Sequence, residues 1–592
     1  MPTYRAPLRE YHFVLDEFLR IGERTDIPGY ADLGDGVLAA LLEGSARICE
    51  GVAQPLNASG DAEGCAWEAG AVRTPAGFPD AYRRFAEGGW IGLALDPAYG
   101  GKGLPAVAAE ACYEMLSSAN MAFSGYVELS EAVFRSIHAH GSEQQRSRFL
   151  PRLASGEWTG AMHLTEPQAG SDLRLVRTRA EPAPGGAWRL HGAKCFITNA
   201  EHDLARNIVH LVLARVAGDA SGAAGLSLFL APKFNVDDEG RMGARNAVQV
   251  TSIEHKMGLR AAPTGIVHYD GAHAELIGER GKGLRAMFTM VNDARLGVAL
   301  QGLSQAEVAC QNAVNYARER RQGRALPGGG TDEPVAIAAH PDVRRMLLAM
   351  RTFTEGARGL ALWVALQIDV AARHPDAAMR ARAEDLLALL TPVIKSHLTD
   401  GGSECAQLAL QCFGGYGYVR DTGVEQFVRD VRITQIYEGT NGIQALDLVR
   451  RKLVQSDGAA GFFAIVEDSI RRAGADAGTA PLATGLRTAL TDLEAATRWM
   501  RERAGAAVID AAAGATDYQR LFGAVALGWI WLEYAGIAAR ALRAGTTDRV
   551  FYERKLALAR FSLARLAPEA AMLRARAVLG ARDLMALAED HL

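Results

Sequence analysis

The 592-residue sequence lacks the cysteine patterns of a disulfide-bonded or metal-binding protein. Its seven cysteines form no C-x-x-C pair, and none has a nearby histidine at metal-ligand spacing. Free thiols are typical of a reducing compartment, and the chain shows no basic-then-apolar segment at its N-terminus. We therefore expect a cytoplasmic protein with no metal site.

A strong net charge is also absent. Lys and Arg total 64 against 68 for Asp and Glu, which gives a formal net charge of −4. Residues 456–592 alone carry 17 positive and 16 negative side chains. Nucleic acid and anionic membranes bind clustered positive charge, so this composition predicts neither of them as a partner.

The sequence has no run of about 18 apolar residues without charge, the minimum for a helix that crosses a membrane. Its most apolar stretch, residues 521–542, contains Glu533 and Arg540, so we predict a buried helix there. The glycine cluster at 99–105 lacks the G-x-x-x-x-G-K-[ST] pattern, and no G-x-G-x-x-G follows a predicted strand. A phosphate-binding loop and a Rossmann dinucleotide site are therefore not predicted.

The spacing of apolar residues divides the chain into four parts. Helical spacing predominates in residues 1–160, and short β-type runs separated by Gly, Pro, Asn and Asp fill 161–278. Long Ala- and Leu-rich helical segments fill 279–455, with a loop at 326–334, and more helices follow in 456–592. This predicts an α+β, mostly helical fold with an N-terminal helical domain, a central antiparallel β domain, a C-terminal helical bundle and an added helical domain.

One acidic residue stands out because of the residues that follow it. Glu438 comes after helix-like sequence and directly before Gly439-Thr440-Asn441-Gly442. The chain can turn tightly there and bring backbone amides close to a ligand. Taken alone, the motif is as consistent with a helix end on the surface as with a catalytic acid.

Five other segments carry residue types that suit a flat, polar ligand. Residues 162–172 (M-H-L-T-E-P-Q-A-G-S-D) offer backbone amides and hydroxyls, and 194–199 (K-C-F-I-T-N) place an aromatic ring and a hydroxyl on neighbouring strand positions. Arginines stand on predicted helices at 291–296 and 316–323, and 411–417 (Q-C-F-G-G-Y-G) runs from a helix into glycines. Singly, each is more simply a structural loop, a core residue, a solvated face or a helix C-cap.

In this order and spacing, the segments together resemble the acyl-CoA dehydrogenase family. The motifs L-T-E-P-x-A-G-S-D, K-x-F-I-T, F-G-G and I-Y-E-G-T carry the resemblance, which covers residues 80–455. The N-terminal segment and the added C-terminal helices resemble the long subgroup of the family, which includes the 3-methylmercaptopropionyl-CoA dehydrogenases. The resemblance implies FAD-dependent α,β-dehydrogenation of an acyl-CoA thioester, with hydride passing to flavin N5 because no side chain accepts a hydride.

The resemblance also assigns roles to individual residues. Glu438 is the implied general base. The implied FAD contacts are Met162, Leu164, Thr165, Ser171, Phe196, Thr198, Arg320, Gln322, Gln411, Phe413, Gly414, Gly415, Thr440, Asn441 and Gly442. The implied substrate contacts are Ser171, Asn292, Arg295 and Gly439. In the family the contacts at 320–322 and 411–415 reach the FAD of a neighbouring subunit, which implies a homodimer or homotetramer.

Two positions depart from the family pattern. Gly323 and Arg324 replace an aromatic-glycine pair that is common in relatives, so the contacts after Arg320 are less well defined. Some relatives carry the catalytic base immediately before the arginine of the CoA-binding segment. That position is Ala294 here, which cannot accept a proton, so Glu438 keeps the role.

The implied product is the trans-2-enoyl-CoA, and the implied electron acceptor is an electron-transfer flavoprotein. The subgroup favours 3-methylmercaptopropionyl-CoA or another short or medium acyl-CoA as substrate, although broad saturated substrates are nearly as well supported. Two alternative functions remain open. One is an acyl-CoA oxidase-like flavoenzyme that oxygen reoxidises, and the other is a DNA-associated flavoprotein on the same fold, which the balanced charge of residues 456–592 disfavours.

Overall fold

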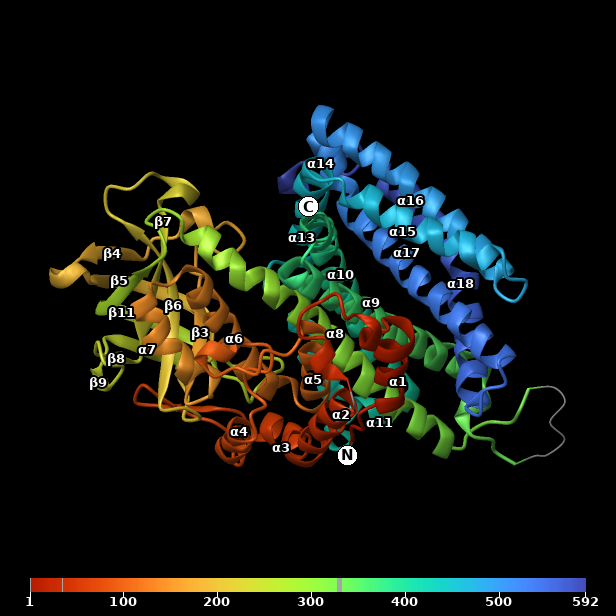
Figure 1. Ribbon diagram of the computed structural model, residues 1–592, viewed down its shortest axis with the longest axis horizontal. Coiled ribbons are helices and arrows are strands. Elements are labelled where there is room, and N and C mark those ends of the chain that lie inside the picture. The colour runs from red at the N-terminus through yellow and green to blue at the C-terminus, as the bar shows by residue number, and fades with distance from the viewer. Residues whose placement is uncertain (1, 35, 327–332) are drawn as a thin grey trace. The chain divides into compact units, whose positions relative to one another are not determined.

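The structure is a computed structural model that describes residues 2–34, 36–326 and 333–592, with the backbone only at 289–294. The described chain divides into two compact units. The unit that we call the β unit comprises residues 44–105 and 115–297, and the helical unit comprises 1–43, 106–114 and 298–592. Figure 1 labels the helices and strands of both units. The fold class is as predicted, and the four-domain division stays a prediction.

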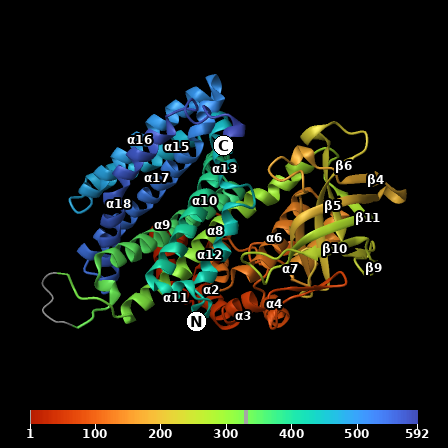
Figure 2. The same cartoon turned by 180° about the vertical axis from the view of Figure 1, so that it is seen from behind.

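The β unit is built around a seven-stranded sheet in the order β10-β11-β5-β4-β6-β3, with β7 paired to β11 and β6 (Figure 2). Its strands are β3 (Trp158–His163), β4 (Arg179–Pro182), β5 (Trp188–Thr198), β6 (Asn207–Val216), β7 (Leu226–Pro232), β10 (Val248–Ile253) and β11 (Thr264–Ile277). Two short pairs accompany it, β1 (Ala66–Glu68) with β2 (Ala71–Arg73) and β8 (Phe234–Val236) with β9 (Met242–Arg245). Its helices are α3 (Pro55–Glu63), α4 (Phe78–Glu87), α6 (Met121–His140) and α7 (Glu143–Ala154).

Strand β6 is buried on both faces of the sheet. Its sequence is almost continuously apolar, as expected for a strand with no solvent-exposed face. Val209, Leu211 and Leu213 pack in one apolar cluster with residues of α6 and α7. Val212 and Ala214 belong to a second cluster on the opposite face, because successive side chains of a strand point to opposite sides.

The sheet differs from the predicted antiparallel domain in one respect. Its pairings are antiparallel except that β6 runs parallel to both β3 and β4. Parallel neighbours need a long connection, and residues 164–206 provide one between β3 and β6. Residues 188–192 and 194–198 are two β-type runs in the sequence, and in the structure they form the single strand β5. The β1–β2 pair lies before α4, at residues 66–73.

The helical unit contains the long helices of the chain. They are α9 (Pro341–Arg373), α10 (Ala377–Phe413), α15 (Gly458–Gly474), α16 (Ala480–Ala506), α17 (Val508–Arg543) and α18 (Arg549–Ala577). Shorter helices are α1 (Leu8–His12), α11 (Gly415–Tyr418), α12 (Glu425–Val431), α13 (Asn441–Asp447) and α14 (Leu453–Gln455). The residues of α2 (Val37–Ile48), α5 (Ala106–Ala119) and α8 (Gly283–Glu319) are divided between the two units. Most of the loop predicted at 326–334 lies outside the described residues.

Helix α17 is the central helix of the added C-terminal part, and it packs against α16, α18, α9 and α10. It contains the apolar stretch 521–542, and among the described residues it alone is long and apolar enough to cross a membrane. However, 83% of its most apolar window is buried inside the protein. This agrees with the prediction of a buried helix.

The N-terminal segment is tied to the added helices through a buried lysine. Lys555 of α18 is fully buried, and its ammonium forms ion pairs with Glu10 and with Glu355 of α9. The ring of Phe13 lies 4.8 Å from that of Tyr534 in an edge-on arrangement. A buried charge is tolerated only when it is paired, so these contacts fix the added helices to the rest of the helical unit.

Candidate active site

Glu438 lies on a tight turn of the helical unit, between the 3-10 helix Arg432–Gln435 and α13. Its φ of 54° and the φ of 86° at Gly439 are both left-handed. A non-glycine residue in this region costs on the order of 1–3 kcal/mol and persists only where the surrounding structure enforces it. The side chain of Glu438 is partly exposed. The turn therefore requires support from its neighbours.

Two buried side chains supply that support. Lys395 of α10 is fully buried, and its Nζ donates to the carbonyl oxygen of Gly439 and to Oδ1 of Asn441, both at 2.9 Å. Gln444 of α13 is also fully buried, and its Nε2 donates to the carbonyl oxygens of Glu438 at 3.1 Å and of Gly439 at 3.4 Å. The carbonyl groups of Glu438 and of the glycine that follows it are thus held by side chains of two helices.

Asn441 connects this turn to helix α10. While its Oδ1 accepts from Lys395, its Nδ2 donates to Oδ1 of Asp400 at 2.7 Å and to Oγ1 of Thr399 at 3.0 Å. Asp400 accepts a further hydrogen bond from Gln435 at 2.6 Å, so both ends of the turn are attached to one carboxylate. Thr440 caps α13 by accepting from the backbone N–H of Ile443.

A chain of hydrogen bonds reaches the residue before Glu438. The hydroxyl of Tyr437 donates to Oε1 of Gln301, and Nε2 of Gln301 lies 2.9 Å from the hydroxyl of Tyr113. Gln301 is 4% exposed, and its amide satisfies both hydroxyl groups. The orientation of Tyr437 is therefore set by α8 and α5.

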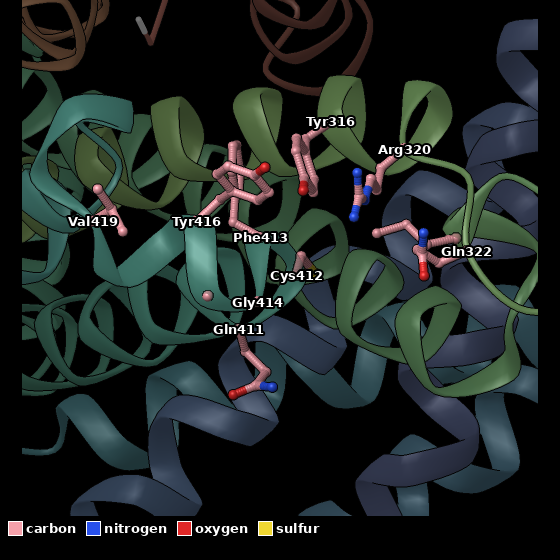
Figure 3. Close-up of a pocket in the computed structure, with 11 residues that line it drawn as sticks. Tyr316, Arg320, Gln322, Gln411, Cys412, Phe413, Gly414, Tyr416 and Val419 are labelled. Carbon is pink, nitrogen blue, oxygen red and sulfur yellow. The ribbon is translucent and has the colours of Figure 1, made fainter.

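A pocket of about 430 Å³ in the helical unit brings together six of the predicted FAD contacts (Figure 3). These are Arg320, Gln322, Gln411, Phe413, Gly414 and Gly415. The ring of Tyr316, which the sequence did not single out, stacks on Phe413 at 4.1 Å with an interplanar angle of 16°. The guanidinium carbon of Arg320 lies 5.8 Å from the centre of the Tyr416 ring. The pocket thus combines aromatic faces, a cation and glycine backbone.

In the β unit, a buried ion pair fixes the backbone beside Leu164 and Thr165, two of the predicted FAD contacts. Nζ of Lys194 donates to the carbonyl oxygen of Leu164 at 2.9 Å and to Oε1 of Glu166 at 2.8 Å. The backbone N–H of Cys195 donates to the carbonyl of Thr165 at 3.0 Å. Met162 is on β3 itself and is 9% exposed. Strand β5 therefore holds the loop that carries Leu164 and Thr165.

The charges of this ion pair are set by burial and by hydrogen bonds. Burial acts to raise the pKa of Glu166, but the Lys194 charge and the N–H groups of Arg177 and Thr178 outweigh it and lower that pKa to about 2. Burial lowers the pKa of Lys194 to about 8, against the opposing effect of Glu166. Both groups are mainly ionised at neutral pH, so the pair is a salt bridge between buried side chains.

The end of β5 exposes an aromatic ring on strained backbone. Phe196 has a φ of 57° and is 64% exposed, which is unusual for a large apolar side chain. The hydroxyl of Thr198 lies 3.1 Å from that of Thr264. Asn199 also has a φ of 57°, and its buried side-chain amide has no hydrogen-bond partner among the described residues. The strand end thus offers a flat face and polar groups to a ligand.

Predicted substrate contacts are less completely placed. Gly439 lies on the turn that follows Glu438, and Arg295 is a buried residue of α8, 8% exposed. Ser171 is exposed on the loop after β3, next to the exposed pair Asp172–Arg174. The side chain of Asn292 lies outside the described residues. Most of the predicted residues therefore fall into three places: the turn at Glu438 and the pocket at Arg320 in the helical unit, and the segments of β3 and β5 in the β unit.

Several supporting residues were not identified from the sequence. Glu166 and Lys194 stand inside the quoted motifs L-T-E-P and K-x-F-I-T, and this was the one available signal for their role. Lys395, Asp400 and Gln301 lie within long helices, where a polar residue is usually solvated. Only the packing of the helices shows that these three side chains face the turn at Glu438.

The described residues suit FAD as a ligand. A guanidinium binds phosphate groups, and a β-carbon placed on Gly414 or Gly415 would meet nothing within 4 Å, so the pocket is open beside their backbone. In the β unit, Phe196 presents a ring face, and the unpartnered amide of Asn199 is a buried polar group of the kind that a bound ligand satisfies. No group of His, Cys, Asp or Glu in the described part of the chain suits a metal ion.

Known families account for most of the chain. Three acyl-CoA dehydrogenase domains match in order, the N-terminal domain at residues 62–157, the middle domain at 161–272 and the C-terminal domain at 281–453. A domain described as acetyl-CoA dehydrogenase C-terminal like matches residues 462–588. A 3-methylmercaptopropionyl-CoA dehydrogenase of Ruegeria pomeroyi is 40% identical over 94% of this chain and 95% of its own length. The chain belongs to the acyl-CoA dehydrogenase family.

Members of this family are oxidoreductases that use FAD. A broad-specificity linear acyl-CoA dehydrogenase of Mycobacterium tuberculosis is 33% identical over 95% of both chains. The solved structure of an acyl-CoA dehydrogenase from Bacillus anthracis complexed with FAD is similar to this fold, with a TM-score of 0.74 and 19% identity over 93% of this chain and 89% of that chain. These three proteins each match the chain over nearly its whole length.

Proposed function

We propose that this acyl-CoA dehydrogenase family member converts an acyl-CoA thioester to the trans-2-enoyl-CoA, with Glu438 as the general base and FAD as the cofactor. The observation that carries the proposal is the turn at Glu438, whose left-handed backbone is held by the buried side chains of Lys395 and Gln444. A helix end on the surface needs no such support. A catalytic carboxylate needs it, because the base must stay within hydrogen-bond reach of one particular proton.

The residues of each unit have distinct proposed roles toward FAD. In the β unit, the Leu164–Thr165 backbone and the side chains of Phe196 and Thr198 hold the ring system. In the helical unit, Arg320 and the glycines at 414–415 hold the phosphates and adenosine of the partner subunit's FAD, while residues 440–442 follow the base. When bound, FAD supplies a hydride acceptor, flavin N5, which no side chain replaces.

Glu438 takes the α-proton of the thioester onto its carboxylate while the β-hydrogen leaves as hydride. The protein lowers the barrier in two ways. Positioned base catalysis contributes on the order of 10²–10⁴ in rate. The backbone N–H of Glu438 donates to the thioester oxygen as negative charge develops there, and loss of such a donor costs about 3–4 kcal/mol.

The substrate class follows from similarity over the full length of the chain. The Ruegeria pomeroyi relative is named for 3-methylmercaptopropionyl-CoA, so we propose that compound or another short or medium acyl-CoA. The test is anaerobic bleaching of the bound flavin by 3-methylmercaptopropionyl-, butyryl-, octanoyl- and palmitoyl-CoA. Fastest bleaching by one of the first three supports the proposal. Fastest bleaching by palmitoyl-CoA contradicts the substrate class, and no bleaching by any of them contradicts the reaction.

We further propose that the electrons pass to an electron-transfer flavoprotein. In an oxidase-like enzyme, oxygen reoxidises the flavin instead. Stopped-flow reoxidation of the substrate-reduced enzyme separates the two functions, because a dehydrogenase is reoxidised rapidly by the flavoprotein and slowly in air. Rapid reoxidation in air alone would assign the oxidase function.

The protein is proposed to act as a homodimer or homotetramer in the cytoplasm. Support for the oligomer is the pocket at Arg320, whose residues correspond to contacts with a neighbouring subunit's FAD. Support for the compartment is that none of the seven cysteines forms a disulfide bond. Light scattering coupled to gel filtration tests the assembly, and an active, FAD-loaded monomer would contradict it.

A further inference from the structure

The added C-terminal helices contact the two helices that hold the turn at Glu438. Helix α17 packs against both α10 and α13 within the helical unit. Helix α10 carries Lys395 and Asp400, which hold the turn, and α13 begins at Asn441, three residues after Glu438. The contact therefore falls on the part of the unit that fixes the proposed base.

The approach of α17 to α10 is close and specific. A β-carbon placed on Gly523 would lie 2.3 Å from the His397 ring, a separation that real β-carbons do not show. Four residues earlier, Gln519 is 2% exposed, and its Nε2 donates to the carbonyl oxygen of Pro392 at 2.8 Å. These contacts lie on either side of Lys395 along α10.

A third contact reaches the turn through one carboxylate. Arg520 of α17 lies 3.5 Å from Oδ2 of Asp400. The other oxygen of Asp400 accepts hydrogen bonds from Asn441 and Gln435, which stand at the two ends of the turn. The ion pair is partly exposed and is the weakest of the three contacts, so Gly523 and Gln519 carry the argument.

We propose that α17 is a positioning element for the catalytic turn, so that the added C-terminal helices hold the base in place as well as enlarge the fold. Gln519 and Gly523 fix the segment 392–400 of α10, and this segment fixes residues 439–441 through Lys395 and Asp400. The consequence for catalysis rests on the proposed role of Glu438, whereas the mechanical coupling of α17 to the turn does not.

Hydrogen exchange of the full-length, FAD-loaded enzyme tests the coupling directly. Gly523→Ala forces α17 away from His397. Gln519→Leu removes the donor to Pro392 and puts an apolar side chain of similar size in its place. Gly536→Ala is the matched control on the same helix, because a β-carbon there meets only the flexible end of Arg540 at 3.4 Å. Peptides covering 432–447 and 508–543 are followed by mass spectrometry.

The proposal expects Gly523→Ala and Gln519→Leu to speed exchange at 432–447 about tenfold or more, with Gly536→Ala unchanged. The limiting rate of flavin reduction should fall roughly 10- to 100-fold in the first two variants, and its pH dependence should shift, while the Kd for acyl-CoA changes little. If Gly523→Ala does not fold, Gln519→Leu decides.

Unchanged exchange at 432–447, with faster exchange confined to 508–543, would overturn the proposal. Faster exchange at 432–447 with an unchanged reduction rate supports the coupling and contradicts the role of Glu438 instead. The two failures are thus distinguished in one set of variants.

Discussion

The ammonium group of Lys395 lies 2.9 Å from the carbonyl oxygen of Gly439, the residue that follows the proposed base. Lys395→Met keeps the length of the side chain but leaves that carbonyl and Oδ1 of Asn441 without this donor. A hydrogen bond to a charged group contributes about 1.5–3 kcal/mol, so we expect the variant to lose stability by about that amount. We also expect slower flavin reduction. Thermal unfolding and anaerobic stopped-flow measure both.

Lys282→Met is the control for this prediction. Lys282 is exposed, so the substitution makes the same chemical change on the surface. The control should match the unmodified enzyme in both measurements. Equal behaviour of Lys395→Met and the control would show that the buried ammonium does not hold the turn.

Glu166→Gln tests the buried ion pair of Glu166 and Lys194, which lies beside the predicted FAD contacts Leu164 and Thr165. The substitution removes the charge that balances Lys194, and leaving one member of a buried pair uncompensated typically costs about 3–5 kcal/mol. We expect lower FAD content after purification and an altered flavin absorption spectrum, because Lys194 also holds the carbonyl of Leu164.

The matched substitution is Glu181→Gln, in an exposed pair with Arg179 on the same sheet. Exposed ion pairs are screened by solvent and contribute little to stability, so this variant should keep its FAD and its spectrum. A Glu166→Gln enzyme with full FAD content and an unchanged spectrum would remove the ion pair from cofactor binding.

Arg320→Met tests the pocket of the helical unit. If Arg320 binds a phosphate of FAD, its loss should weaken FAD retention, and added FAD should restore part of the activity. Arg318→Met is the control, because Arg318 is an exposed residue near the end of α8, two positions before Arg320, and does not line the pocket. Equal dissociation constants for FAD in the two variants, measured by fluorescence of the released flavin, would contradict the assignment.

Three buried histidines should make the protein sensitive to acid. Burial lowers the pKa of His202 and of His210 to about 3, and that of His397 to about 4, from an ordinary value of 6.5. The unfolded chain therefore binds more protons than the folded one below pH 6.5. Stability is fully present above pH 6.5 and is lost as pH falls toward 3, by up to about 1.4 kcal/mol per pH unit for each histidine.

His202 is the histidine best suited to test this dependence. Its Nδ1 accepts from the backbone N–H of Leu204, so Nε2 carries the proton and faces the hydroxyl of Thr159 at 2.9 Å. A second proton on the ring would oppose that N–H. Denaturant unfolding of His202→Gln between pH 7 and 4 should show a shallower loss of stability than the unmodified protein. An identical slope would mean that His202 does not contribute to it.

The helices and strands could be predicted from the sequence more completely than the side chains that hold the candidate site. The fold class and the buried helix at 521–542 follow from the spacing of apolar residues, which local sequence reports directly. The parallel pairing of β3 with β6 does not, because a strand sequence carries no sign of its partner's direction. Glu438 was identified by the resemblance to the family, and Gly439 marked the tight turn because a left-handed backbone favours glycine.

The side chains that hold the site could not be predicted for a different physical reason. Lys395 is 44 residues from Gly439 in the sequence, and Gln519 is 127 residues from Pro392. A lysine or glutamine in a helix is usually solvated, and only the packing of α10 against α13 and α17 buries these two. Long-range contacts of this kind depend on the folded arrangement and not on a local pattern.

The central claim is that Glu438 removes the α-proton of the substrate. Anaerobic stopped-flow reduction of FAD-loaded Glu438→Gln by 3-methylmercaptopropionyl-CoA or the best acyl-CoA of the panel tests it most directly, with the exposed Glu384→Gln of α10 as the control. We predict normal FAD content and acyl-CoA binding, with flavin reduction slowed by roughly 10²–10⁴. Reduction of the Glu438→Gln flavin at a rate close to that of the control would contradict the assignment of the base.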